Sequence, residues 1–247
     1  MEENQNNNSS NDQNANMNFN VNANEVKQET QQTMNEVKNT FQNTNFKQDT
    51  QAAKGFFSDF FKNPLGEIKK VATDSKNSFV KIAIIIFVVW LVVLFVAEIF
   101  DIASTYLFGT YGSFERFFRN LFPNILNIIK QLLVPILTVL VLSGLVYGFK
   151  KNKNKSFLTI ASTILVAEIP VVIASIVNLL TILGSGVLKL TSYFSGFCSI
   201  LSTVLLYFAI KELSDEGENK SYFWKYALII GIFYVVSFVL SYLGIYL

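Results

Sequence analysis

A single uninterrupted apolar stretch constrains this chain more than any other feature. From Ile82 to Ala97 it contains sixteen residues without a polar side chain, flanked by Lys81 and Glu98. With its apolar neighbours it reaches the roughly 20 residues that a helix needs to cross a bilayer core. Four more apolar segments of similar length follow, which is more than the core of a soluble domain needs. The sequence therefore predicts an all-α membrane protein.

The five apolar segments predict a bundle of five transmembrane helices within residues 79–247. The expected spans are 79–100, 128–149, 157–183, 188–210 and 226–247. Pro135 interrupts the second span, and Pro170 lies near the middle of the third. The third span is long enough to cross the bilayer at a tilt.

Lysine and arginine are divided unequally between the two ends of these spans. If the N-terminus is cytoplasmic, the cytoplasmic flanks hold twelve lysines, four of them within 150–155. The opposite flanks hold four basic residues, Arg116, Arg119, Lys130 and Lys189. Because cytoplasmic loops carry the excess of positive charge, we expect a cytoplasmic N-terminus and an external C-terminus. The Asn-rich, histidine-free, lysine-biased composition indicates an AT-rich bacterial genome, and thus the bacterial cytoplasmic membrane.

Residues 1–50 are expected to form a disordered cytoplasmic tail. The first 53 residues contain 23 Asn and Gln. Such a segment has too little apolar surface to offset the entropy lost on ordering.

Residues 51–78 predict two amphipathic helices directly before the first span. Asn63 and Pro64 end the first helix and begin the second, with Asn63 as the N-cap. We expect both helices to lie on the anionic inner leaflet, although packing against each other in water is the alternative. The expected membrane-surface residues are Phe56, Phe57, Phe60, Phe61, Lys69 and Lys70.

A third amphipathic segment follows the first span, on the other side of the membrane. Its apolar stripe is Phe114, Phe117, Phe118, Leu121 and Phe122. Pro123 is expected to end this interfacial helix before the second span begins.

Glu168 is the candidate polar site within the membrane, because a carboxylate at that depth must be paired, protonated or hydrated. One interpretation is a proton- or ion-coupled site, with Asn178, Lys130 or Lys189 as partners. The other is a structural hydrogen bond to a neighbouring helix beside the Pro170 kink, where freed carbonyls need donors.

Small residues in two spans predict close packing of helices. Gly144 and Gly148 form a G-x-x-x-G at the end of the second span. The fourth span carries a longer small-residue face, made of Ser192, Ser195, Gly196, Ser199, Ser202 and Thr203.

Composition excludes several classes of chemistry. The chain has no histidine, so it cannot build a Ser-His triad or a His-ligated metal site. Cys198 is the single cysteine, and no nucleotide, hydrolase or metalloprotease motif is present. The net charge of +2 is too small to indicate nucleic-acid binding. We therefore expect no enzyme activity, catalytic residue, cofactor or metal.

The layout resembles the bacterial branch of the Yip1-domain family of multi-pass membrane proteins. The resemblance rests on the stretch FKNPLGEI before the first span, on Lys155-Ser156-Phe157 leading to Ile169-Pro170, and on LLYFAIKELSDEGENKSYFWK between the last two spans. It implies an integral membrane protein and does not specify its role.

Two functions follow as hypotheses. The first is a non-enzymatic scaffold or adaptor that binds other membrane proteins, or itself, through its small-residue faces. The second is a small permease in which Glu168 carries the coupling.

Overall fold

The computed structural model describes residues 31, 34, 35, 38, 46–74, 78–106, 113–149, 155–180, 185–214 and 221–242. The side chains of 46–50, 121, 185–188 and 221 are outside this description. Most of the predicted tail, most of the lysine cluster at 150–155 and the end of the fifth predicted span lie outside the described residues. Every regular element in the described ranges is a helix, which confirms the predicted all-α fold.

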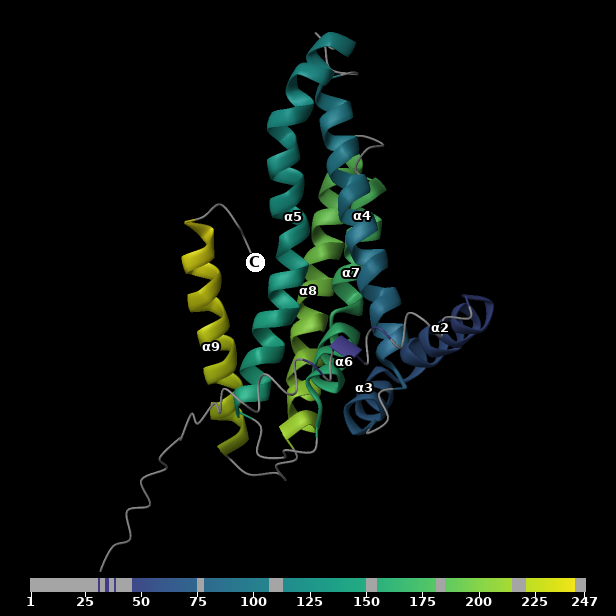
Figure 1. Ribbon diagram of the computed structural model, residues 1–247, viewed down its shortest axis with the longest axis vertical. Coiled ribbons are helices and arrows are strands. Elements are labelled where there is room, and N and C mark those ends of the chain that lie inside the picture. Colours follow the sequence, from purple (N-terminus) through teal and green to yellow (C-terminus); the bar gives the residue numbers. More distant parts are fainter. Residues whose placement is uncertain are drawn as a thin grey trace, which may run out of the picture.

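Five long elements run alternately up and down, so that consecutive elements are antiparallel (Figure 1). They are α4 (Val80–Tyr106), α5 (Phe114–Phe149), the pair α6 (Phe157–Ala167) and α7 (Ile169–Asn178), α8 (Ser185–Ser214), and α9 (Ser221–Ser241). Two shorter helices, α2 (Phe46–Lys62) and α3 (Pro64–Thr73), lie at one end of the bundle.

Two long-range hydrogen bonds join the segments that meet at this end. Thr159, in the first turn of α6, donates to the carbonyl of Asp74 at 3.3 Å. Lys155, just before α6, donates to the carbonyl of Glu212 in the last turn of α8 at 2.5 Å. The end of α3, the start of α6 and the end of α8 therefore lie close together.

Four of the described helices are long and apolar enough to cross a membrane. These segments are Val80–Tyr106, Phe122–Phe149, Lys189–Ser214 and Tyr222–Ser241. The pair α6 and α7 passes the same test when taken together, and counts as a fifth crossing if the bent pair is one span. Large apolar side chains such as Val92, Phe197 and Val235 are exposed on these helices, as expected for surfaces that face lipid.

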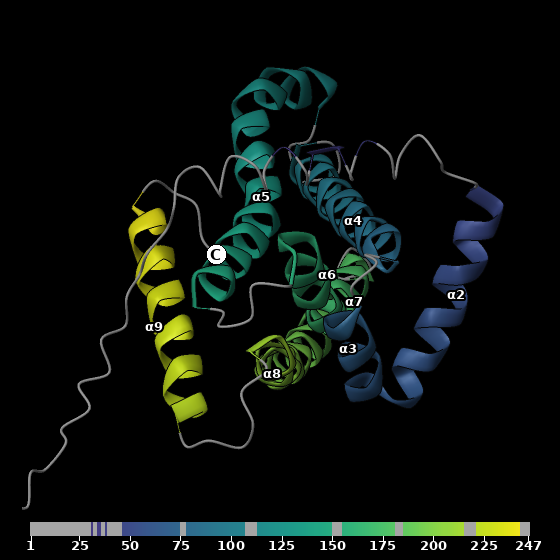
Figure 2. The same cartoon turned by 60° about the horizontal axis from the view of Figure 1, so that its bottom comes forward.

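The broken pair α6–α7 occupies the centre of the molecule. Every residue from 162 to 170 is buried. The pair packs against α4, α5 and α8, and α6 also packs against α3 (Figure 2). The segment that carries Glu168 is thus surrounded by protein.

Local sequence explains how α3 begins and which way it faces. The Asn63 side chain accepts a hydrogen bond from the backbone N–H of Gly66 at 3.0 Å, and Pro64 occupies the first turn. The predicted cap is confirmed. Ile68 and Val71 are almost fully buried, because α3 packs against α6 and α8. The preceding helix α2 begins at Phe46, a few residues before the predicted end of the tail.

The prediction that Pro123 ends a separate interfacial helix is wrong. Helix α5 continues through Pro123 and Pro135, over 36 residues. A proline inside a helix leaves carbonyls without their usual backbone donors. For Pro123 the carbonyl that lacks this donor belongs to Arg119. Two asparagine side chains nearby donate to other carbonyls of the same helix, Asn120 to Arg116 at 2.8 Å and Asn124 to Asn120 at 2.7 Å.

Candidate functional site

Glu168 stands at the break between α6 and α7. The two helices meet there at an angle of 47°, where a single tilted span was predicted. Pro170 in the first turn of α7 has no N–H to donate to α6, so one hydrogen bond of the helical ladder is missing at this break. The backbone N–H of Glu168 makes the ordinary helical bond to the carbonyl of Ile164 at 3.1 Å and also reaches that of Leu165 at 3.2 Å.

Ser202 on α8 holds this break from the side. Its hydroxyl lies 2.8 Å from Oε2 of Glu168 and 3.1 Å from the carbonyl oxygen of Ala167. A serine hydroxyl has one proton, so these two acceptors share it. Glu168 is 8% exposed and Ser202 is 3% exposed, so the contact is in the interior. It couples the helix break to the neighbouring span.

A cavity of about 180 Å³ lies beside Glu168. Its wall combines the carboxyl group with hydroxyl groups, aliphatic side chains and two aromatic rings from α5, α7, α8 and α9. The lining residues are Thr138, Leu142, Glu168, Val171, Ser199, Ser202, Thr203, Leu206, Ile230, Phe233 and Tyr234. None of these residues is Lys or Arg.

The predicted partners of Glu168 lie elsewhere. Asn178 is at the far end of α7, about 15 Å along the helix, where its side-chain oxygen accepts from Ser195 at 3.0 Å. Lys130 and Lys189 are not among the residues that line the cavity. The structure therefore does not bring Glu168, Asn178 and Lys130 together as one site.

The predicted packing glycines face outward. Gly144 and Gly196 are exposed, and a Cβ atom built on either would meet no other atom within 4 Å. Gly148, Ser192 and Ser199 are exposed as well, and Ser199 borders the cavity. These residues do not mediate close helix packing within the described part of the chain, so their surfaces are open to lipid or to another protein.

The predicted membrane-surface residues are divided between the interior and the exterior. Phe56 and Phe60 are only 5% and 3% exposed, and Phe57 is partly buried. The Phe56 ring packs against Phe79 with centroids 5.9 Å apart. The sequence predicted that lipid would cover this face of α2. In the structure α3 and the start of α4 cover it instead. Phe61, in contrast, is 65% exposed.

The two predicted surface lysines, Lys69 and Lys70, are exposed on α3. Lys70 forms an ion pair with Glu67, which is one turn earlier on the same helix and buried. The hydrogen bond that Lys70 donates to the Glu67 carboxylate, together with the negative charge of that carboxylate, raises the pKa of Lys70. Lys70 therefore remains charged and shields a carboxylate that would otherwise lie unpaired.

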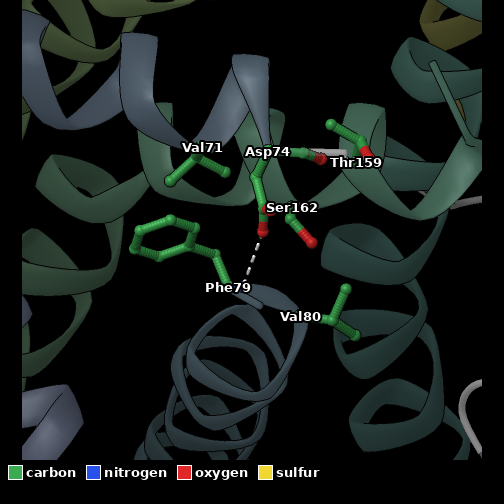
Figure 3. Close-up of a pocket in the computed structure, with 6 residues that line it drawn as sticks. All are labelled: Val71, Asp74, Phe79, Val80, Thr159 and Ser162. Carbon is green, nitrogen blue, oxygen red and sulfur yellow. Dashed lines mark hydrogen bonds between the residues drawn. The ribbon is translucent and has the colours of Figure 1, made fainter. Parts of the chain in front are cut away.

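The junction of α3, α4 and α6 is tightly closed (Figure 3). Asp74 accepts a hydrogen bond from the backbone N–H of Phe79 at 3.2 Å, which caps the start of α4. Val71, Val80 and Ser162 complete the junction, and these side chains leave no room for a water molecule between them. The junction is structural rather than a binding site.

Ser202, Thr138 and Tyr234 are the site residues that sequence reasoning missed. Ser202 was predicted only as one member of a small-residue face. Its separation of 34 residues from Glu168 gives no local signal for their contact. Among the described residues, no group of three or more acidic or sulfur-containing side chains is placed to hold a metal ion.

No family model matches the chain. No curated protein and no solved structure matches it either.

Proposed function

We propose that this chain is a five-span protein of the bacterial cytoplasmic membrane, and that it acts as a non-enzymatic scaffold. It would hold other membrane proteins, or copies of itself, against its exposed helix surfaces. The observation that carries the proposal is the outward position of the small residues on α8. Ser192, Gly196, Ser199 and Thr203 recur every three or four residues and are all exposed.

This α8 face is suited to a partner helix. In a bilayer the hydrophobic effect does not drive helices together, so association depends on close contact between backbones. Glycine and serine permit that contact because little side chain stands between the helices. The exposed side chains of Tyr193, Phe197 and Ile200 flank the face and enlarge the contact area.

The orientation proposed from the sequence is supported by where the lysines lie. Lys69 on α3, Lys81 at the start of α4, Lys155 before α6 and Lys211 at the end of α8 belong to the same end of the bundle. Arg116 and Arg119 belong to the other end. The positive-inside rule assigns the lysine-rich end to the cytoplasm. A protein of this layout is what the Yip1-domain resemblance implies.

The experiment is crosslinking and affinity capture from membranes, with Gly196→Leu and Gly231→Leu compared with the original chain. Both glycines are exposed, and both have open space where the new side chain begins. Only Gly196 lies on the small-residue face. The scaffold predicts that Gly196→Leu loses the crosslinked complex and that Gly231→Leu keeps it. Equal capture by all three proteins would contradict the proposal.

A second candidate function is a small permease, favoured by the position of Glu168 at a broken helix beside a cavity. Discontinuous helices with a polar group near the bilayer midplane are the usual binding sites of transporters. Glu168→Gln keeps the shape of the side chain and removes its charge. A permease predicts loss of solute uptake in this variant while crosslinking is unchanged, and unchanged uptake would exclude coupling through Glu168.

A further inference from the structure

The charge, hydrogen-bonding groups and size of the cavity beside Glu168 together indicate the class of ligand that it can bind. We infer that it is a binding site for a small organic ammonium ion. The inference concerns binding alone, so it applies to a scaffold that senses the ligand and to a permease that moves it.

The charge of the groups that line the cavity favours a cationic ligand. The Glu168 carboxyl group lines the cavity, and no lining residue is Lys or Arg. Within the described residues its hydrogen-bond donor is the neutral hydroxyl of Ser202. An ionised carboxylate in an apolar interior is stabilised when an opposite charge lies beside it. The lining of the cavity supplies no such charge, and a bound cation would.

The hydroxyl groups near Glu168 present acceptors to the cavity. The Ser202 hydroxyl donates to Glu168 and to the carbonyl of Ala167. The Thr203 hydroxyl donates to the carbonyl of Ser199 at 2.9 Å. The oxygens of both hydroxyls remain free to accept further hydrogen bonds. These groups offer one carboxylate and two acceptor oxygens to a ligand that has several N–H donors, and the hydroxyls of Thr138, Ser199 and Tyr234 in the same lining can also accept.

Size and polarity distinguish an organic cation from a metal ion. The cavity of about 180 Å³ exceeds the ~150 Å³ of an engineered protein cavity that binds benzene. Leu142, Val171, Leu206 and Ile230 add aliphatic surface to the lining of the cavity. A metal ion needs a compact set of oxygen ligands and gains nothing from aliphatic contacts. An alkyl- or arylammonium ion can contact both the polar and the aliphatic groups, and the lining also contains two aromatic rings, Phe233 and Tyr234, of a kind that attracts positive charge.

The test is calorimetric titration of the purified full-length protein in detergent, with benzylammonium and n-butylammonium chloride as probes. Benzyl alcohol is the neutral control for benzylammonium, since it has nearly the same shape. The original chain should bind at least one ammonium probe and should bind benzyl alcohol much more weakly. Glu168→Gln should weaken ammonium binding by at least about tenfold, because it removes one member of a buried charge pair.

Two further variants make the result unambiguous. Glu98→Gln removes a carboxylate on α4 that does not line the cavity, and it should bind the probe like the original chain. Ile230→Trp fills the cavity from α9 and leaves Glu168 in place, so it should also abolish binding, even if Glu168→Gln does not fold. The inference is overturned if neither probe binds or if benzyl alcohol binds equally well. It is also overturned if sodium or potassium chloride alone gives the same heat, or if Ile230→Trp binds normally.

Discussion

The phenol of Tyr222 donates a hydrogen bond to the backbone carbonyl of Tyr207 at 2.6 Å, and the two rings meet edge to face with centroids 5.2 Å apart. This contact fixes the first turn of α9 to α8. Further along, α9 exposes Tyr234, Val235 and Phe238, and little of the chain packs against it. The last helix is therefore held mainly at one end.

Replacing Tyr222 with Phe should destabilise the attachment of α9. The substitution keeps the ring contact and removes the hydrogen bond, which is worth about 1 kcal/mol and leaves the Tyr207 carbonyl without this donor. Thermal unfolding in detergent measures the effect, followed by the fluorescence of Trp224 on α9 in a Trp90→Phe background that removes the second tryptophan. Tyr242→Phe is the control, because Tyr242 is 78% exposed and should lose almost nothing. Equal effects of the two substitutions would show that the bond does not hold α9.

Two buried serines should respond oppositely to replacement by alanine. Ser202→Ala removes the donor to Glu168 and Ala167 and should cost about 1–3 kcal/mol. Ser143 on α5 is equally buried, but its hydroxyl has no hydrogen-bond partner among the described residues. Ser143→Ala should be neutral or stabilising, since it removes an unsatisfied polar atom. Unfolding in a series of denaturing detergent mixtures compares the stability of the two variants. A larger loss of stability for Ser143→Ala than for Ser202→Ala would contradict the described arrangement.

Adjacent phenylalanines on α2 separate a role in the core from a role at the membrane surface. Phe60→Ala should cost about 3–5 kcal/mol of stability, because the side chain is buried among α2, α3 and α4. Phe61→Ala should leave stability nearly unchanged, because Phe61 is exposed. Thermal unfolding tests the first expectation. If both variants melt like the original chain, α2 does not pack on the bundle as described.

The proposed orientation is tested by fusions at the two ends of the chain. Alkaline phosphatase folds only outside the cytoplasm, so its fusion to the C-terminus should be active and its fusion to the N-terminus inactive. The expected reason is the excess of lysines at the ends of the spans that would face the cytoplasm. An active N-terminal fusion, or an inactive C-terminal one with normal expression, would reverse the topology or change the number of spans.

Local patterns in the sequence were sufficient to predict the helices. They were not sufficient to predict what each helix packs against. The cap at Asn63 and Pro64 was predictable because it depends on four consecutive residues. The stripe containing Phe56 and Phe60 correctly indicates a buried face. It cannot show whether lipid or protein covers that face, because both are apolar.

The candidate site was predicted only in part, for a similar reason. Glu168 was identifiable because a carboxylate is rare in an apolar run, and Pro170 indicated a kink. Its partner Ser202 lies on α8, and only the central position of α6–α7 brings the two together. Pro123 was misread because a proline within a helix can kink it rather than end it, and α5 continues through this position.

The burial of α3 against α8 has a consequence for how the protein is made. Val71 belongs to the same packed cluster as Ile210 and Leu213, which the ribosome adds about 140 residues later. At ~5–20 residues per second, the apolar side of α3 exists for about 7 to 28 seconds before those residues are synthesised. During that interval the nearest apolar phase is the bilayer surface, which accommodates an amphipathic helix. We therefore expect this segment to rest on lipid early in biosynthesis, whereas in the finished fold Val71 on the same surface is packed in the protein interior.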